Sequence, residues 1–188
     1  MKIKQNINML ASYLNENSEY IHKCVNDIAN IVCETYKNNG KILSAGNGGS
    51  ASDAQHLVCE LVGRFLKERK ALAAICLNCN TSILTAVAND YGYDKCIARQ
   101  VEALCGNNDA LFLYSTSGNS KNLLAAAETA HKIGTQIISF TGFKGGALKS
   151  ISDYNFNVGL NSTPRVQEIH GLTNHLLCEA VEDMMFGS

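Results

Sequence analysis

Two pairs of polar residues in this sequence of 188 residues have the types and the spacing to bind a metal ion or to move protons. His56 and Glu60 are four residues apart, so on a helix their side chains project from the same face. Gln167 and His175 are eight residues apart, just over two helical turns, so they also share roughly one face. Imidazole, carboxylate and amide oxygen together make a plausible zinc site. A His-x-x-x-Glu pair alone is also typical of an acid–base pair and, most often, of an ordinary surface contact.

Two segments rich in glycine and serine follow short apolar stretches and have the composition of phosphate-binding loops. The first is "AGNGGSAS" at 45–52 and the second is "STSGNSKN" at 115–122. Hydroxyls and backbone N–H groups at the start of a helix suit a phosphate monoester dianion, and the helix dipole favours its charge. One such loop alone is as readily a serine-rich helix cap without a ligand. Two of them at the ends of adjacent strands favour a phosphate site.

The first loop does not complete the motifs of the common nucleotide-binding proteins. No Gly-Lys-Ser/Thr follows "GNGGSASD", so it is not a P-loop and hydrolysis of a nucleoside triphosphate is not expected. Gly46, Gly48 and Ala51 do match the G-x-G-x-x-A spacing of dinucleotide-binding proteins. That fingerprint also requires an acidic residue near the end of the second strand, where "AICLNCN" carries none. A small phosphorylated molecule is therefore the preferred ligand.

The elements that position these residues alternate between strand and helix. The spacing of apolar residues predicts a helix to about residue 17 and a second helix at 19–37. Beyond them we expect strands at 41–45, 71–77, 110–115, 135–141 and 154–160, with helices at 50–66, 81–88, 93–104, 121–134, 146–152 and 164–186. Such alternation predicts an α/β protein whose parallel sheet is covered on both faces. Ligands of such sheets bind beyond the carboxyl ends of the strands, where both loops lie.

Length and composition predict one domain over 1–188, with an N-terminal helical arm at 1–38 and an αβα core at 41–188. The arm has no partner within the domain, so we expect it to pack against another subunit. The net charge of −1 gives no reason to expect nucleic acid or an anionic membrane as a partner. The eight cysteines are scattered among apolar residues without a secretory segment, which predicts reduced, buried thiols and a cytoplasmic protein. Cys76 and Cys79 form an isolated C-x-x-C, for which neither a redox nor a zinc role is expected.

Four stretches in order, "AGNGGSASDAQHLVCELVGRF", "VANDYGYD", "LYSTSGNSKN" and "RVQEIHGLTNHLL", closely resemble the phosphoheptose isomerase family of sugar isomerase (SIS) domains. The resemblance runs from about Lys41 to the C-terminus, and the helical arm also fits the family. It implies a three-layer αβα sandwich with a five-stranded parallel sheet of the flavodoxin-like type. It further implies a homotetramer with active sites at the subunit interfaces.

The resemblance also implies a reaction, in which D-sedoheptulose 7-phosphate and D-glycero-D-manno-heptose 7-phosphate interconvert through an enediol. The product would feed the synthesis of heptose precursors for lipopolysaccharide core or capsule. One Zn²⁺ per subunit would be bound by His56, Glu60, Gln167 and His175, with Glu60 as the base and His175 as the acid. The implied substrate contacts are Asn47, Gly48, Gly49, Glu60, Asn89, Asp90, Ser115, Thr116, Ser117, Ser120 and Gln167.

Two alternatives share most of these features. One is a non-catalytic SIS protein that binds a phosphosugar as a regulator, like the protein associated with the bacterial replication initiator. It would not need the metal and acid–base residues, so their presence argues against it. The other is an isomerase of a different ketose phosphate. Pro164 departs from the polar or small residue expected before Gln167, and His170 matches no ligand position, so we interpret it as structural.

Overall fold

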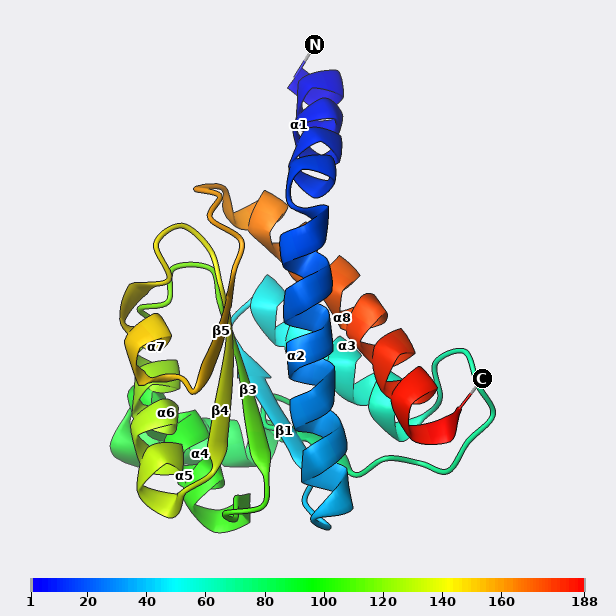
Figure 1. The fold of residues 1–188 in the computed structure, drawn as a ribbon. Coiled ribbons are helices and arrows are strands. Elements are labelled where there is room, and N and C mark those ends of the chain that lie inside the picture. Colours follow the sequence, from blue (N-terminus) through cyan, green and yellow to red (C-terminus); the bar gives the residue numbers. More distant parts are fainter. Residues whose placement is uncertain (1, 188) are drawn as a thin grey trace.

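Five short apolar strands form a fully parallel sheet in the computed structural model, which describes residues 2–187 (Figure 1). The sheet order is β2-β1-β3-β4-β5, which is the flavodoxin-like order. The strands are β1 (Ile42–Gly46), β2 (Ala74–Cys76), β3 (Ala110–Ser115), β4 (Gln136–Thr141) and β5 (Tyr154–Asn157). Because β1 and β3 are hydrogen-bonded neighbours, with Gly46 opposite Tyr114, the two predicted phosphate loops leave the sheet side by side.

Helices cover both faces of the sheet and confirm the predicted three-layer sandwich (Figure 1). One face packs against α2 (Ser18–Lys37), α3 (Gly49–Val62) and α8 (Thr163–Phe186). The other packs mainly against α5 (Cys96–Leu104) and α6 (Lys121–Ile133), with α4 (Thr81–Tyr91), α7 (Gly146–Ile151) and the short 3₁₀ helix Tyr93–Lys95 beside them. Alternate residues of a strand face opposite sides, so Phe112 belongs to the first core and Leu111 and Leu113 to the second.

Three elements are at least three residues shorter than the sequence patterns predict. The third helix ends at Val62 rather than at 66, β2 occupies three residues rather than seven, and β5 ends at Asn157 rather than at 160. The end of α3 has an identifiable cause. The chain after Gly63 turns away because its backbone N–H groups find an acceptor on α8, more than a hundred residues later.

That acceptor is the carboxylate of Glu182 on α8, which is buried against the segment that follows α3. Its Oε1 accepts from the N–H of Phe65 at 2.9 Å, and its Oε2 accepts from the N–H groups of Leu66 and Lys67, both at 2.8 Å. Arg69 Nε donates to the same carboxylate at 2.8 Å, and these two side chains are only 1% and 2% exposed. Burial alone would raise the pKa of Glu182, but the three N–H donors and the guanidinium together lower it.

Arg69 also determines how α3 ends. Its Nη2 donates to the carbonyl of Glu60 at 2.7 Å and its Nη1 to the carbonyl of Leu61 at 2.9 Å. These are two of the carbonyls that the last turn of a helix leaves without an intrahelical partner. The buried pair of Arg69 and Glu182 therefore fixes the C-terminal turn of α3, from which Glu60 projects.

The first helix, α1 (Lys2–Glu16), extends away from the sheet (Figure 1). None of its residues is buried, and Ile3 and Ile7 are 77% and 61% exposed. The break before α2 falls at Asn17, as predicted. The expectation that the whole arm at 1–38 has no partner within the domain is wrong for α2, whose Ile21, Val25 and Ile28 are buried in the core it shares with the sheet and α8. No helix within residues 2–187 combines the length and apolar character needed to span a membrane. All eight cysteines are free thiols, but Cys59 and Cys79 are exposed, so the prediction that the thiols are buried holds only in part.

We expect Glu182→Ala to destabilise the protein by about 3–5 kcal/mol, because it leaves the buried Arg69 charge without a partner. Equilibrium unfolding in urea measures the change. Glu68→Ala is the matched control, since the Glu68 side chain is 91% exposed, and it should change the free energy of unfolding by less than about 0.5 kcal/mol. Because the native pKa of Glu182 is lowered, its contribution should be complete above the ordinary value of 4.5 and lost as the pH falls through the native pKa. Equal losses for the two variants would contradict the assignment.

Candidate active site

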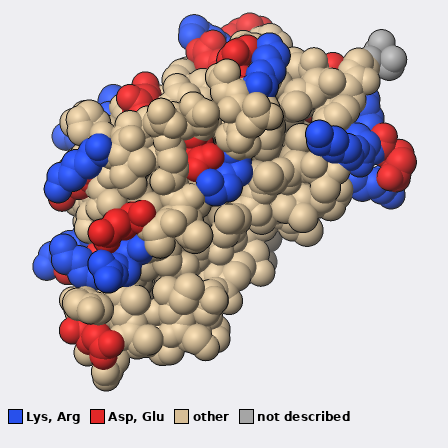
Figure 2. All heavy atoms as spheres, turned by 90° about the horizontal axis from the view of Figure 1, so that it is seen from below, with Lys and Arg blue, Asp and Glu red and all other residues tan. Residues whose placement is uncertain are grey.

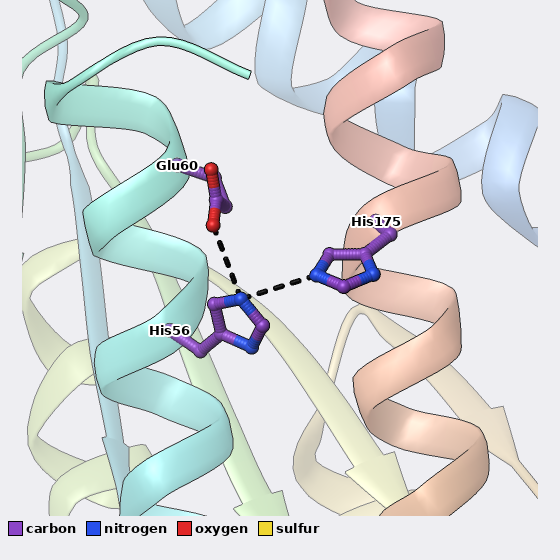
Figure 3. A group of neighbouring side chains, drawn as sticks. All are labelled: His56, Glu60 and His175. Carbon is purple, nitrogen blue, oxygen red and sulfur yellow. Dashed lines mark hydrogen bonds and ion pairs between the residues drawn. The ribbon is translucent and has the colours of Figure 1, made fainter. Parts of the chain in front are cut away.

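His56, Glu60 and His175 converge from two helices and point toward one another (Figure 3). His56 Nε2 lies 3.1 Å from Glu60 Oε1, one turn further along α3, and 3.1 Å from His175 Nε2 on α8. All three donor atoms lie within 4.8 Å of one another. The predicted helical spacing of His56 and Glu60 is therefore present, and α8 supplies the third member of the group.

This group, which we call the His–Glu–His cluster, fits a divalent metal ion. Imidazole nitrogen and carboxylate oxygen bind such an ion at about 2.0–2.2 Å, so tetrahedral geometry places neighbouring donors about 3.3 Å apart. The two separations of 3.1 Å from His56 Nε2 are close to this value. Three protein ligands leave one further position of a tetrahedral ion for another ligand.

Contacts around the cluster fix the imidazole of His175. Phe65, the first residue held by Glu182, stacks on His175 with ring centroids 5.4 Å apart and an angle of 25° between the planes. The neighbouring Asn174 is fully buried and donates to the carbonyl of Asp53 on α3 at 3.0 Å. Tyr114 at the end of β3 donates to Asn174 at 2.6 Å. The sheet, α3 and α8 are thus joined by polar contacts directly behind the cluster.

Two titratable groups, the half-buried Asp53 and the buried His170, lie next to this polar contact. Burial raises the pKa of Asp53 to about 6, an effect that His56 opposes, and Asp53 Oδ2 has no hydrogen-bond partner among the described residues. His170 is fully buried beside the rings of Tyr114, Phe140 and Phe156. Burial lowers the pKa of His170 to about 4, so its imidazole is neutral near pH 7. Its position agrees with the structural role predicted for it.

The two glycine- and serine-rich loops line one pocket of about 280 Å³ at the carboxyl ends of β1 and β3. The lining residues are Asn47, Gly48, Gly49, Ser50, Tyr114, Ser115, Thr116, Ser117, Ser120, Thr163 and Gln167. Helices α3 and α6 both begin at this pocket, so their positive ends favour a bound anion. Gly48 has a φ of +55°, a conformation that favours glycine. A side chain at Gly49 would lie 2.7 Å from the amide of Gln167.

The remaining predicted residues differ in whether they line the loop pocket. Gln167 lines the loop pocket, where its Nε2 donates to Ser50 Oγ at 3.2 Å. Asn89 and Asp90 are exposed near the end of α4, joined to each other at 2.8 Å, and do not line the pocket of their own chain.

Several residues at the site were not predicted from the sequence. Tyr93 donates to Asn47 Oδ1 at 3.0 Å, Asn122 bonds to the Asn47 amide, and Thr163 lines the loop pocket. Asn122 stands inside the quoted "STSGNSKN" segment, but nothing in its spacing distinguishes it from a capping residue. Phe65 and Arg69 carry no local signal either, because their partners lie more than a hundred residues away.

The sheet order and the paired helix N-termini at the loop pocket are those of a sugar isomerase domain, and the sequence pattern of the SIS domain matches residues 5–142. The phosphoheptose isomerase of Helicobacter pylori strain P12 is 49% identical over 169 residues, which are 90% of this chain and 88% of the relative. The structures of phosphoheptose isomerases from Francisella tularensis and Neisseria gonorrhoeae match with TM-scores of 0.93 and 0.91, at 34% and 35% identity over 97% of each chain. This chain belongs to the phosphoheptose isomerase family.

If the His–Glu–His cluster is a metal site, the purified protein should bind about one divalent ion per chain. Removing a ligand in His56→Ala should weaken binding by more than the roughly 100-fold that loss of an outer hydrogen-bond partner can cause. Metal analysis after dialysis, followed by competition with a chelator, measures both quantities. His131→Ala is the control, since His131 is exposed in the last turn of α6. Equal metal retention by the two variants would contradict the site.

Proposed function

We propose that this protein is an aldose–ketose isomerase that interconverts D-sedoheptulose 7-phosphate and D-glycero-D-manno-heptose 7-phosphate through an enediol. The observation that carries the proposal is a pocket at the N-termini of α3 and α6 that is also lined by α8, so that it shares α3 and α8 with the His–Glu–His cluster. The 49% identity to a named phosphoheptose isomerase over 90% of the chain supports the choice of reaction. We further propose that the product supplies heptose precursors for lipopolysaccharide core or capsule, in the cytoplasm.

The spacing along α3 suits a seven-carbon sugar phosphate. Ser50 at the loop pocket and His56 in the cluster are six residues apart, which is about 9 Å along a helix at 1.5 Å per residue. The six carbon–carbon bonds of a seven-carbon chain, each about 1.5 Å long, span about 8 Å in a zigzag. With the 7-phosphate in the loop pocket, C1 and C2 can therefore lie at the His–Glu–His cluster.

The isomerisation requires that a proton move between C1 and C2 and that charge on the oxygens be stabilised. We assign Glu60 as the base that removes the carbon-bound proton and His175 as the acid at the oxygens, a role that His175 takes only while its imidazole is protonated and released from any metal ion. Only Oε1 of Glu60 contacts His56. Glu60 Oε2 has no hydrogen-bond partner among the described residues, so it is free to accept the proton.

A metal ion suits this site chemically. We propose one Zn²⁺ per subunit on His56, Glu60 and His175, with the amide oxygen of Gln167 as the fourth ligand, since the bond to Ser50 uses only the amide nitrogen. Bound there, Zn²⁺ would act as a Lewis acid toward the substrate oxygens. The polar residues of the loop pocket, together with Asn89 and Asp90, are the proposed contacts to the phosphate and the sugar hydroxyls.

We also propose a homotetramer in which the helical arm at 1–38 is an interface and neighbouring subunits complete the active sites. A groove of about 570 Å³ between α2 and α8 supports this, because its apolar lining is rimmed by Glu179 and Asp183. The exposed α1 carries Ile3 and Ile7 together with Lys4, so a second copy of α1 matches the groove in both polarity and charge. Asn89 and Asp90, which lie outside the pocket of their own chain, are available to the site of a neighbour.

Glu60→Gln should lower kcat for sedoheptulose 7-phosphate by about 10²- to 10⁴-fold, the contribution of a positioned general base. Chromatographic separation of the two heptose phosphates measures turnover, and NMR detection of solvent deuterium at C1 or C2 reports the proton transfer itself. Glu128→Gln, at an exposed position of α6, is the matched control and should leave both unchanged. If the zinc-loaded wild-type protein neither converts nor deuterates the substrate, the proposed reaction is wrong.

The double substitution Ile3→Asp and Ile7→Asp should shift the protein from a tetramer to smaller species, because it places charge on the apolar stripe of α1. Size-exclusion chromatography with light scattering gives the mass at several concentrations. Ser12→Asp adds charge to an exposed polar position of the same helix and should leave the mass unchanged. A wild-type protein that is monomeric at micromolar concentration would contradict the proposed assembly.

A further inference from the structure

The side chains of Asn47 and Asn122 form a reciprocal amide pair between the two loops. Asn47 Nδ2 donates to Asn122 Oδ1 and Asn122 Nδ2 donates to Asn47 Oδ1, both at 2.9 Å. Tyr93 donates a third hydrogen bond to Asn47 Oδ1 at 3.0 Å. The carbonyl oxygen of the Asn47 side chain therefore accepts two hydrogen bonds from protein and has no free acceptor position for a ligand.

The position of Asn122 separates it from the residues that face the pocket. It is 3% exposed in the first turn of α6, and it does not line the pocket, whereas Asn47 does. Asn47 directly follows β1, and α6 follows the second loop after β3. The amide pair consequently joins the start of the first loop to the helix that begins at the second.

The other side-chain contacts that hold each loop do not reach the other loop. In the second loop, Ser115 Oγ accepts from the N–H of Gly118 and contacts Ser120 Oγ at 3.2 Å. In the first loop, Asn78 bonds both the N–H and the carbonyl of Gly46, at 2.9 Å and 3.0 Å. Among the described residues, the two hydrogen bonds of the Asn47–Asn122 pair are the only side-chain hydrogen bonds between the first loop and the segment 115–122.

A phosphate bound between two loops requires both sets of donors at a fixed separation, and holding them in place before binding lowers the entropic cost of binding. We propose that Asn122 is a positioning residue that sets the first phosphate loop against the second through Asn47. This inference rests on the proposed function of the pocket as the phosphate site. It assigns Asn122 a role in phosphate affinity and none in the proton transfer at the His–Glu–His cluster.

The test measures KM and kcat for sedoheptulose 7-phosphate, and Kd for inorganic phosphate by calorimetry, in the zinc-loaded full-length protein. Asn122→Ala should raise both KM and Kd about tenfold, the effect of one or two side chains losing their fixed positions, while kcat stays within about threefold. Asn155→Ala is the matched control for lost stability. Asn155 on β5 is half-buried and its side-chain amide donates to Ser139 and Thr141 on β4, but it does not line the pocket. It should leave KM and Kd unchanged.

A double-mutant cycle distinguishes positioning through Asn47 from a general loss of stability. If Asn122 acts through Asn47, the variant with Asn47→Ala and Asn122→Ala should bind phosphate no more weakly than the weaker single variant. The inference would be overturned if the effects of Asn47→Ala and Asn122→Ala on the Kd for phosphate multiplied independently. It would also be overturned if Asn155→Ala raised KM as much as Asn122→Ala does. If phosphate and substrate bind neither the wild-type protein nor Asn122→Ala, the proposed phosphate pocket itself fails. If both bind the two proteins equally, the pocket stands and the role of Asn122 is wrong.

Discussion

The packing of α3 against α8 is the contact on which both halves of the candidate site depend. The two helices run in the same direction, so successive residues of α3 meet successive residues of α8. Ser50 contacts Gln167 at the loop pocket, Asp53 accepts from Asn174 in the middle, and His56 contacts His175 beyond it. A rotation of either helix by one residue, about 100°, would separate all three pairs together. The buried pair of Glu182 and Arg69 lies at the far end of this interface and fixes its last turn.

The sequence patterns predicted the fold because its signals are local. Short apolar strands, glycine-containing helix ends and the alternation of strand and helix all lie within windows of about twenty residues. The helix predicted to end at residue 66 ends at Val62 instead, because a distant contact overrides the local pattern. "GRFL" continues an apolar helical pattern, yet Phe65 and Leu66 donate their N–H groups to Glu182 on the last helix. No local signal indicates an acceptor at that distance along the chain.

The candidate site, like the fold, was only partly predictable from local sequence patterns. Helical spacing brought His56 and Glu60 together, and the resemblance to a family added His175, which the structure places 3.1 Å from His56. The hydrogen bond of Gln167 to Ser50 depends on the register between two helices, which spacing within α8 does not determine. Asn122 illustrates the remaining limit. As a sequence feature it is an asparagine at the start of a helix, and only the neighbouring positions of β1 and β3 give it Asn47 as a partner.

The two ends of the site differ in rigidity, and the difference follows from what each end must do. At the phosphate end, the lack of a side chain at Gly49 lets the backbone lie close to Gln167, and the Asn47–Asn122 amide contacts hold the loops, so the donors are in place before a ligand arrives. At the His–Glu–His cluster, the side chain of His56 is 40% exposed and that of Glu60 is 19% exposed. A reaction through an enediol gains from excluding water, because electrostatic stabilisation of the oxyanion is stronger in a site of low dielectric constant. In a single chain the cluster is too open for that, so closure by substrate or by a neighbouring subunit is a physical requirement of the proposed chemistry. Asn89 and Asp90 at the end of α4 are exposed and do not line the pocket of their own chain, which is why we propose them for that role in another copy.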